Sequence, residues 1–280
     1  MAISSTHYQL LKSIRHILPQ GGSLLEIGEA NWYGDANPLR MYDDINEEFT
    51  VRFDERHNVA NLDEWPDAAK QLRAASESGS LFAVARAAYK ILFDPSRIVS
   101  IDFDGSPEAL RYDLNKTLPG YYPPIHGPMG LDDEGEEALG QFDLVYNHGT
   151  AEHIFNIAQV FRTMHDHCID GGLMIHESPF TGWLDHGFYC LQPTLFYDLA
   201  AANCYEIVLV AIEHIESRTI IRLESREHVY ELGKRGEIPN NSMLYVVYRK
   251  RGDRPFKIPM QGYYARSLSA KGMQAWGEMR

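Results

Sequence analysis

The chain has 280 residues, 44% of them hydrophobic, and a formal net charge of −13. This length and composition are typical of one large globular domain with a substantial core. So acidic a surface repels phosphate backbones, which argues against nucleic acid as a general partner. The sequence has no stretch that approaches a membrane span and no signal-peptide pattern at its start. Three cysteines without CxxC spacing predict reduced thiols that are small core residues of a cytoplasmic protein.

The first half of the chain alternates predicted helices and strands. Apolar residues at helical spacing, ended by proline or glycine, predict the helices, and short apolar runs predict buried strands. In order, these elements are a helix over 5–18, a strand over 23–28, a polar insertion over 35–80 with a helix near 65–75, a helix over 81–93, and strands over 97–105 and 110–119.

The second half continues the alternation and ends in two strands. Its predicted elements are a strand over 142–148, a helix over 157–168, a strand over 171–179, a helix over 193–203 opened by proline, and strands over 205–215 and 242–250 with no helix between them. The pattern predicts an α/β fold, a Rossmann-like doubly wound sheet of seven strands, mostly parallel with an antiparallel last strand. We expect residues 1–280 to form a single domain, with 35–80 inserted as a lid or cap.

Polar residues collect at the carboxyl ends of these predicted strands. Ligands of such sheets bind there, at the point where the strand order reverses. A single site therefore explains these residues better than chance scatter does. They are Glu26, Asp102, Asp113, Asn147, His148 and Glu177.

The turn after the first strand, LLEIGEANWYG at 24–34, limits the choice of cofactor. A dinucleotide needs a glycine-rich turn for its pyrophosphate, but here Gly28 is followed by Ala30 and Trp32. The sequence also contains no GxxxxGK[ST] motif for ATP. S-adenosylmethionine (SAM) has no phosphate, and its cationic methionine end and ribose diol suit acidic side chains.

Several blocks, taken in order, resemble the class I SAM-dependent methyltransferases. They are LLEIGEA, IVSIDFDG, YDLNKTLP, FDLVYNHGTAEHIFN, GGLMIHESP and HGFYCLQPTLFYDLA, and they cover about residues 20–250. More narrowly, the chain resembles a bacterial methyltransferase-domain group. The sequence departs from the family pattern at Trp32, where a glycine is usual. The spacing between Asp102 and Asp113 is also too short for the usual helix.

The resemblance implies a set of cofactor contacts. It places the strand end at Glu26 near the methionine part, Asp102 at the ribose, and Asp113 and Leu114 at the adenine edge. Gly28 and Ala30 would let the cofactor approach the backbone, and Asn147 and His148 would complete the site. Structural roles are the alternative: a helix cap for Glu26, an N-cap for Asp102 and an Asx turn for Asp113.

The candidate catalytic residues follow the fourth and fifth strands. In the resembling family, a Glu-His pair such as Glu152-His153 lies beside the transferred methyl. His186 and Tyr189 belong to a loop expected to overhang the same pocket. We expect His153 or His186 to act as general base and Tyr189 to shape the pocket, because histidine titrates near neutral pH. The alternative is that His153 packs at the helix start and holds Glu152 in place.

The sequence does not predict a metal site. His176, Glu177, Asp185 and His186 are ligand types, but adjacent strand residues such as His176 and Glu177 point to opposite faces of the sheet. There is also no HExxH motif. We therefore expect catalysis without a metal ion.

The function that these observations favour is SAM-dependent methylation of a small polar acceptor at oxygen or nitrogen, with a sugar or glycan precursor as one candidate. A degenerate methyltransferase fold that serves as a binding subunit is the alternative, and an NAD-dependent oxidoreductase is disfavoured by the missing glycines. Oligomerisation is left open. The insertion carries aromatic residues that would line an acceptor pocket or form a small core of their own: Tyr42, Phe49, Phe53 and Trp65.

Overall fold

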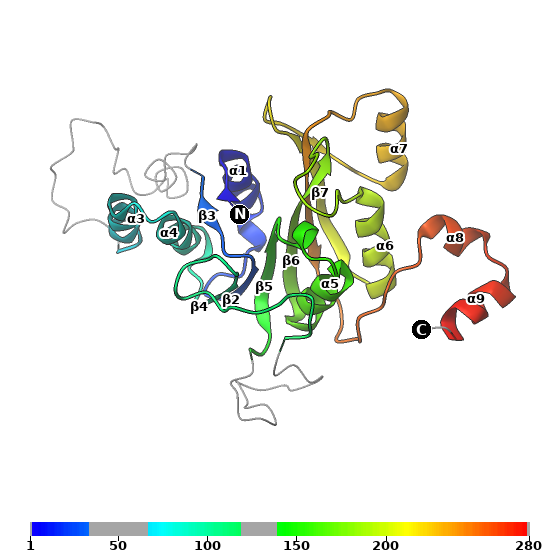
Figure 1. Ribbon diagram of the computed structural model, residues 1–280, viewed down its shortest axis with the longest axis horizontal. Helices are drawn as coiled ribbons and strands as arrows, with labels where there is room; N and C mark the ends of the chain where they lie inside the picture. The colour runs from blue at the N-terminus through cyan, green and yellow to red at the C-terminus, as the bar shows by residue number, and fades with distance from the viewer. Residues whose placement is uncertain (1, 34–66, 119–138, 279–280) are drawn as a thin grey trace.

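The computed structural model describes residues 2–33, 67–118 and 139–278 (Figure 1). Most of the predicted lid at 35–80, including Tyr42, Phe49, Phe53 and Trp65, lies outside the described residues, so its role stays a prediction. Within the described ranges, the helices are all too short or too polar to cross a membrane.

The described part of the chain centres on a sheet of seven strands. In spatial order they are β4 (Arg97–Ile101), β2 (Ser23–Ile27), β5 (Phe142–His148), β6 (Cys168–Thr181), β9 (Ser242–Arg249), β7 (Glu206–His214) and β8 (Thr219–Arg222). The first four run parallel to one another, whereas β9 is antiparallel to both of its neighbours. This arrangement confirms the predicted Rossmann-like sheet and its antiparallel last strand.

Helices cover both faces of the sheet (Figure 1). One face packs against α1 (Ser5–Ser13), α3 (Asp67–Ser78) and α4 (Leu81–Phe93), and the other against α5 (Ile157–Asp166) and α6 (Pro193–Asn203). Alternation along the strands supplies both cores, because successive side chains point to opposite faces. In β2, Leu24 faces the α1–α4 core and Leu25 faces the α5–α6 core.

Helix α4 matches its predicted range of 81–93 because the sequence carries a capping residue before its start and a helix-ending residue after its end. The side chain of Ser80 caps the first turn by accepting the N–H of Ala83 at 3.3 Å. Asp94 then turns the backbone left-handed, with φ of 44°, just before Pro95. Between these ends, alanine and branched or aromatic residues bury one face against the sheet.

The crossovers place the switch point of the sheet between β2 and β5. The connection from β2 to β4 includes α3 and α4 on one face, and the connection from β5 to β6 uses α5 on the other. Ligands of open α/β sheets bind beyond the strand ends at this position. The candidate site should therefore lie where the loops after β2, β4 and β5 meet.

Several predicted elements differ from the structure. The strand expected over 110–119 is absent: a single bridge pairs Leu110 with Ile101, and the chain then turns. The first helix ends at Ser13 and continues as a 3₁₀ turn, η1 (Arg15–Ile17). The seventh strand of the sheet is instead β8, a short hairpin partner of β7.

Five further helices and strands of the described residues were not predicted. Helix α7 (Arg226–Lys234), capped by Ser225, separates β8 from β9, where we expected no helix. Beyond the sheet, α8 (Gly262–Ser267) and α9 (Ala270–Glu278) extend away from the body of the molecule (Figure 1). Near the start of the chain, β1 (Ala2–Ile3) pairs with β3 (Asn31–Trp32) and so fixes the turn after β2.

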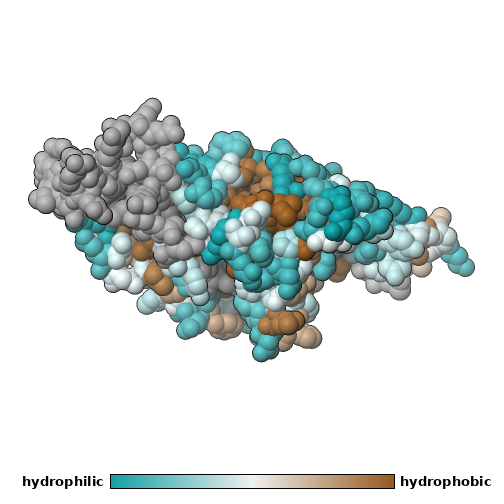
Figure 2. All heavy atoms as spheres, turned by 90° about the horizontal axis from the view of Figure 1, so that it is seen from above, coloured by the Kyte–Doolittle hydropathy of each residue, from teal (hydrophilic) through white to brown (hydrophobic). Residues whose placement is uncertain are grey.

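The surface follows from the composition. Figure 2 shows a face that is mostly hydrophilic, with its most extensive hydrophobic patch near the middle and smaller ones toward the lower edge. All three cysteines are free: Cys168 is buried in the core as expected, but Cys190 and Cys204 are exposed. The prediction that the cysteines are core residues was therefore wrong for two of the three.

Candidate functional site at the switch point of the sheet

Gly28 forms the turn at the end of β2. Its φ of 82° lies in the left-handed region that favours glycine, and its N–H donates to the carbonyl of Ile101 at 2.8 Å. A Cβ at this position would overlap the hydroxyl of Thr150, from the loop after β5. The glycine is thus required by the close approach of two protein loops, and its predicted contact with a cofactor stays a prediction.

Asp102 follows β4 and holds this turn in place. Its carboxylate accepts the N–H of Glu29 at 2.9 Å and the N–H of Asp104 at 2.8 Å. The side chain remains partly exposed, so its oxygens have lone pairs for a further donor. Arg111 steadies the same loop by donating to the carbonyls of Asp102 and Gly105, each at 2.8 Å.

Glu29 is a residue of this site that the sequence analysis missed. It is buried, and its carboxylate accepts from Arg86 at 2.8 Å and from the hydroxyl of Ser106 at 2.9 Å. A Cβ on Gly105 would come within 2.6 Å of Glu29 Oε2, so the carboxylate fills the loop after β4. An acid directly after the turn glycine, in the sequence IGEA, was the available signal.

Glu26 faces inward. Its carboxylate accepts from the Ser100 hydroxyl at 2.6 Å and the Tyr89 hydroxyl at 2.9 Å, and it lies 3.2 Å from His148 Nε2. Burial, followed by the nearby Glu26 charge, raises the pKa of Tyr89 well above its ordinary value. Glu26 therefore belongs to a buried polar cluster, and its predicted contact with the methionine part of a cofactor stays a prediction.

Asn147 and His148 end β5 on opposite faces of the sheet. Asn147 Oδ1 accepts the N–H groups of Thr150 at 3.1 Å and Ala151 at 2.9 Å, which shapes the next loop. The His148 ring is buried beside Glu26, and burial lowers its pKa below the usual range despite the hydrogen bond to Glu26. Both side chains already have partners within the protein, and their predicted contact with a cofactor stays a prediction.

The proposed adenine residues lie in the turn that replaces a third strand. Asp113 accepts the N–H of Asn115 at 3.0 Å, which is the Asx turn considered as the alternative. The Asn115 side chain and N–H together lower the pKa of Asp113. Leu114 and Ala30 are buried, so their roles toward a cofactor also stay predictions.

The rings of His153 and His186 lie close together, and their predicted catalytic roles stay predictions. Their ring centroids are 4.9 Å apart, although one follows β5 in η4 (Ala151–His153) and the other follows β6. Tyr189, in the same loop as His186, donates its hydroxyl to the carbonyl of Phe155 at 2.8 Å. That bond fixes the loop after β6 on the loop after β5.

Glu152 lies between the two loops, and the sequence analysis did not select it as a catalytic residue. The residue is fully buried, and neither carboxyl oxygen has a hydrogen-bond partner among the described residues. Burial raises the pKa of Glu152 to about 8. His186 Nε2 lies 3.8 Å from Glu152 Oε1, so an imidazole from the loop after β6 faces this buried carboxyl group.

Glu152, His186 and His153 are side chains that can exchange protons. Proton transfer is therefore the chemistry that these two loops favour. Burial and the neighbouring His186 lower the pKa of His153, which keeps its imidazole neutral and able to accept a proton. Perturbed groups gathered in a loop above strand ends are typical of functional sites.

Within the part of the chain that the structure describes, two clusters have donor atoms close enough for a metal ion. One is Glu152, His153 and His186, and the other is His7, His148 and Glu177. His176, which we weighed as a ligand, lies on the opposite face against Phe161 and Phe196, and burial lowers its pKa to about 3. The sequence argument that His176 and Glu177 face apart is therefore confirmed.

Comparisons with known proteins give matches among solved structures alone. Neither the protein-family models nor the curated proteins include a match to this chain. A SAM-dependent methyltransferase from Mesorhizobium loti is 14% identical, with a TM-score of 0.39, over 88% of this chain and 99% of that one. The [4+2]-cyclase SpnF is 13% identical, with a TM-score of 0.39, over 88% and 82% of the two chains.

A third match shows the same low level of similarity. The methyltransferase MycE of the mycinamycin biosynthetic pathway, solved with Mg and SAH, is 14% identical with a TM-score of 0.38; the match covers 90% of this chain but 51% of that one. Because these structures include a cyclase and share so few residues with this chain, they do not identify its reaction. On the evidence of its own sheet, the chain has the Rossmann-like fold that we expected of a class I SAM-dependent methyltransferase.

Proposed function

We propose that the protein is a SAM-dependent methyltransferase whose acceptor is a small polar molecule bearing a hydroxyl group or an amine. The observation that carries the proposal is the switch point itself: a one-glycine turn at Gly28, the partly exposed carboxylate of Asp102, and the buried Glu152 beside His186. Carboxylates gather there without the glycine-rich turn that a pyrophosphate needs. The protein would act in the cytoplasm.

At the cofactor end, Asp102 is the residue whose side chain suits SAM, because its carboxylate can accept hydrogen bonds from the ribose. Two backbone N–H groups orient its carboxylate, and spare lone pairs remain for the two hydroxyls of a ribose. Phe103, the next residue, is 67% exposed and offers an apolar ring beside that carboxylate. When bound, SAM supplies an electrophilic methyl group on a sulfonium.

At the acceptor end, the chain supplies position and a proton acceptor. His186, or His153 beside it, would take the proton of an acceptor hydroxyl. Glu152 stands next to His186, and its carboxylate form can stabilise an imidazolium there. The remaining contribution is orientation of the two reactants in line.

The cofactor half of the proposal is tested by calorimetry. SAM or S-adenosylhomocysteine should bind and NAD should not. Asp102→Asn should weaken SAM binding by about 1.5–3 kcal/mol, the amount lost with hydrogen bonds to a charged group. Asp104→Asn, an exposed neighbour in the same loop, is the matched control and should leave the affinity nearly unchanged. NAD binding without SAM binding would sink the proposal.

The catalytic half is tested by single-turnover kinetics once an acceptor is found. Replacing the true base by alanine should slow the chemical step about 10²–10⁴-fold and leave SAM affinity nearly intact. The variants to compare are His153→Ala and His186→Ala, with His228→Ala on the distant helix α7 as control. If both single variants keep normal rates, proximity alone carries the reaction.

The insertion after β2 is proposed as the lid over the acceptor. Leu72 of α3 is buried in the core, so a deletion must stop before Asp67. Removing residues 40–62 should therefore spare SAM binding and abolish methyl transfer. A folded deletion variant with full activity would contradict the lid role.

A binding subunit with a degenerate methyltransferase fold is the second candidate. It is favoured by the internal use of Glu26, Gly28 and Asn147, which leaves fewer groups for a cofactor. The two functions differ in one measurement, because a degenerate subunit should bind neither SAM nor S-adenosylhomocysteine in calorimetry.

A further inference from the structure

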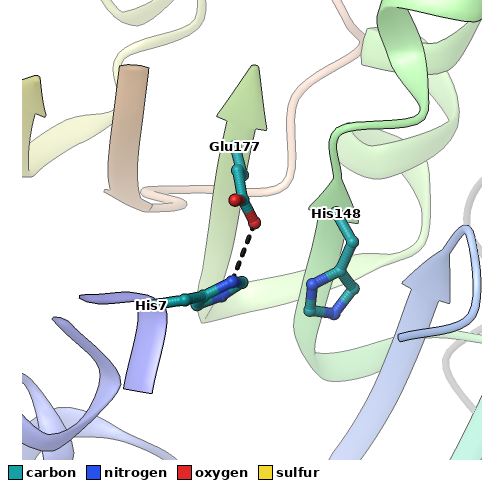
Figure 3. A group of neighbouring side chains, drawn as sticks. All are labelled: His7, His148 and Glu177. Carbon is teal, nitrogen blue, oxygen red and sulfur yellow. Dashed lines mark ion pairs between the residues drawn. The ribbon is translucent and has the colours of Figure 1, made fainter. Parts of the chain in front are cut away.

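A buried cluster of ligand-type side chains lies beneath the proposed catalytic loops. Figure 3 shows the His7 and His148 rings and the Glu177 carboxylate converging from α1, β5 and β6. One donor atom from each lies within 4.8 Å of the others, and all three residues are buried. His7 Nδ1 and Glu177 Oε2 are 2.9 Å apart, close to the separation of about 3.3 Å between two ligands of a tetrahedral ion with 2.0–2.1 Å bonds.

The charges in this cluster call for a cation. Glu177 and Glu26 are two buried carboxylates, and their ion pairs within the described residues are with histidines, His7 and His148. Burying a carboxylate is costly unless a positive charge compensates it. A divalent cation among the three side chains would supply that charge.

Each of the three side chains also has a buried atom to offer a metal ion. Among the described residues, these atoms have no hydrogen-bond partner: His7 Nδ1, His148 Nδ1 and Glu177 Oε2. A metal ion bound by all three would satisfy them together.

Neighbouring side chains hold the two imidazole rings by hydrogen bonds, as groups behind the ligands do in metal sites. His148 Nε2 lies 2.8 Å from the Tyr89 hydroxyl and 3.2 Å from Glu26, which leaves Nδ1 for the centre of the cluster. His7 Nε2 contacts the Tyr146 hydroxyl, which leaves Nδ1 for the same centre. A carboxylate behind a ligating histidine fixes the ring and raises its basicity.

We propose that His7, His148 and Glu177 form a binding site for a first-row transition metal ion such as Zn²⁺. Two imidazoles and one carboxylate suit Zn²⁺ or Fe²⁺, whereas Mg²⁺ and Ca²⁺ prefer oxygen ligands. With three protein ligands the ion keeps an open position for water or another ligand. The ion also ties α1 to the strand ends of β5 and β6, which are far from α1 in the sequence.

The test uses the full chain, stripped with a chelator and titrated with ZnCl₂. Mass spectrometry of retained metal should give about one Zn²⁺ per chain, and Zn²⁺ should raise the melting temperature, because an ion that binds the folded state stabilises it. His148→Gln and Glu177→Gln should each weaken binding about tenfold or more. His176→Gln is the matched control, a buried β6 histidine on the opposite face, and should keep the ion.

The outer cluster of Glu152, His153 and His186 is a competing site, so each measurement is repeated in a His186→Gln background. Loss of Zn²⁺ from His186→Gln, with retention by His148→Gln, would place the ion in the outer cluster and overturn the proposal. So would a wild-type chain that retains no stoichiometric metal.

Cobalt gives a second readout that does not depend on stability. Co²⁺ bound by His7, His148 and Glu177 should show the visible bands of four-coordinate cobalt, and Glu177→Gln, nearly the same shape as glutamate, should lose them while its circular dichroism stays native. SAM affinity is measured on the same samples. A chain that binds metal but not SAM would therefore refute the proposed function alone.

Discussion

At the scale of single residues, Glu26 and Glu152 show how surroundings decide what a buried carboxyl group does. Glu26 accepts hydrogen bonds from Tyr89 and Ser100, which fix it as part of the interior. The oxygens of Glu152 have no such partners among the described residues, and burial raises its pKa to about 8. Because Glu152 also faces His186, it is the better candidate for proton chemistry.

Glu152 should make folding stability depend on pH. Its pKa is raised in the folded state, from 4.5 to about 8, so its contribution is fully present below pH 4.5 and is lost as the pH rises through 8. Glu152→Gln cannot ionise, so its stability relative to the wild type should increase between pH 5 and 8, by on the order of a few kcal/mol. Urea unfolding at pH 5, 6, 7 and 8 measures this, with Glu231→Gln on the surface as control. A constant difference between the two chains would refute the raised pKa.

At the scale of elements, the structure depends on how strand ends are tied to their neighbours. Lys250, just after β9, is 1% exposed and donates to the carbonyls of His165 and Cys168, each at 2.8 Å. These carbonyls belong to the end of α5 and the start of β6. One lysine therefore satisfies the backbone groups of a tight helix-to-strand junction.

Lys250→Met should destabilise the fold by about 3 kcal/mol, because it leaves two buried carbonyls without a donor. Thermal and urea unfolding measure the loss. Arg251→Met is the neighbouring control: Arg251 forms an exposed pair with Glu206, and such pairs contribute little. Equal effects of the two substitutions would show that the buried contacts of Lys250 add nothing.

At the scale of the whole molecule, acid should unfold this protein through its buried histidines. Burial lowers the pKa of His165 to about 4 and that of His176 to about 3. Because a histidine of the unfolded chain takes up its proton near pH 6.5, the stability present above that pH is lost as the pH falls toward 4.

The expected loss between pH 6.5 and 4 is on the order of a few kcal/mol, and the chain should take up protons as it unfolds there. Unfolding in urea across this range measures the slope. His176→Phe, placed among aromatic residues, should flatten the slope, whereas His16→Phe, on the half-exposed η1, should not. A wild-type stability that stays constant from pH 6.5 to 4 would contradict the interpretation.

The sequence predicted the sheet because its periodicity is local. Helix 81–93 carries its cap and its stop signal within a few residues, and the strands over 23–28 and 142–148 are short apolar runs. The prediction of a third strand over 110–119 was wrong because the hydrogen bonds that Asp113 makes within its own turn compete with sheet pairing. Helix α7 was missed although Ser225 is an ordinary N-cap, because its apolar face is narrow.

The candidate site shows the limit of such local signals. The sequence by itself determined the alternating architecture, the one-glycine turn and the acids at strand ends, because each depends on neighbouring residues. The tertiary structure decided that Glu26 is already bonded within the protein, whereas the carboxyl oxygens of Glu152 have no hydrogen-bond partner among the described residues. It also brought His7 to His148 and Glu177. Contacts across so many residues depend on how the layers pack, which no short stretch of sequence encodes.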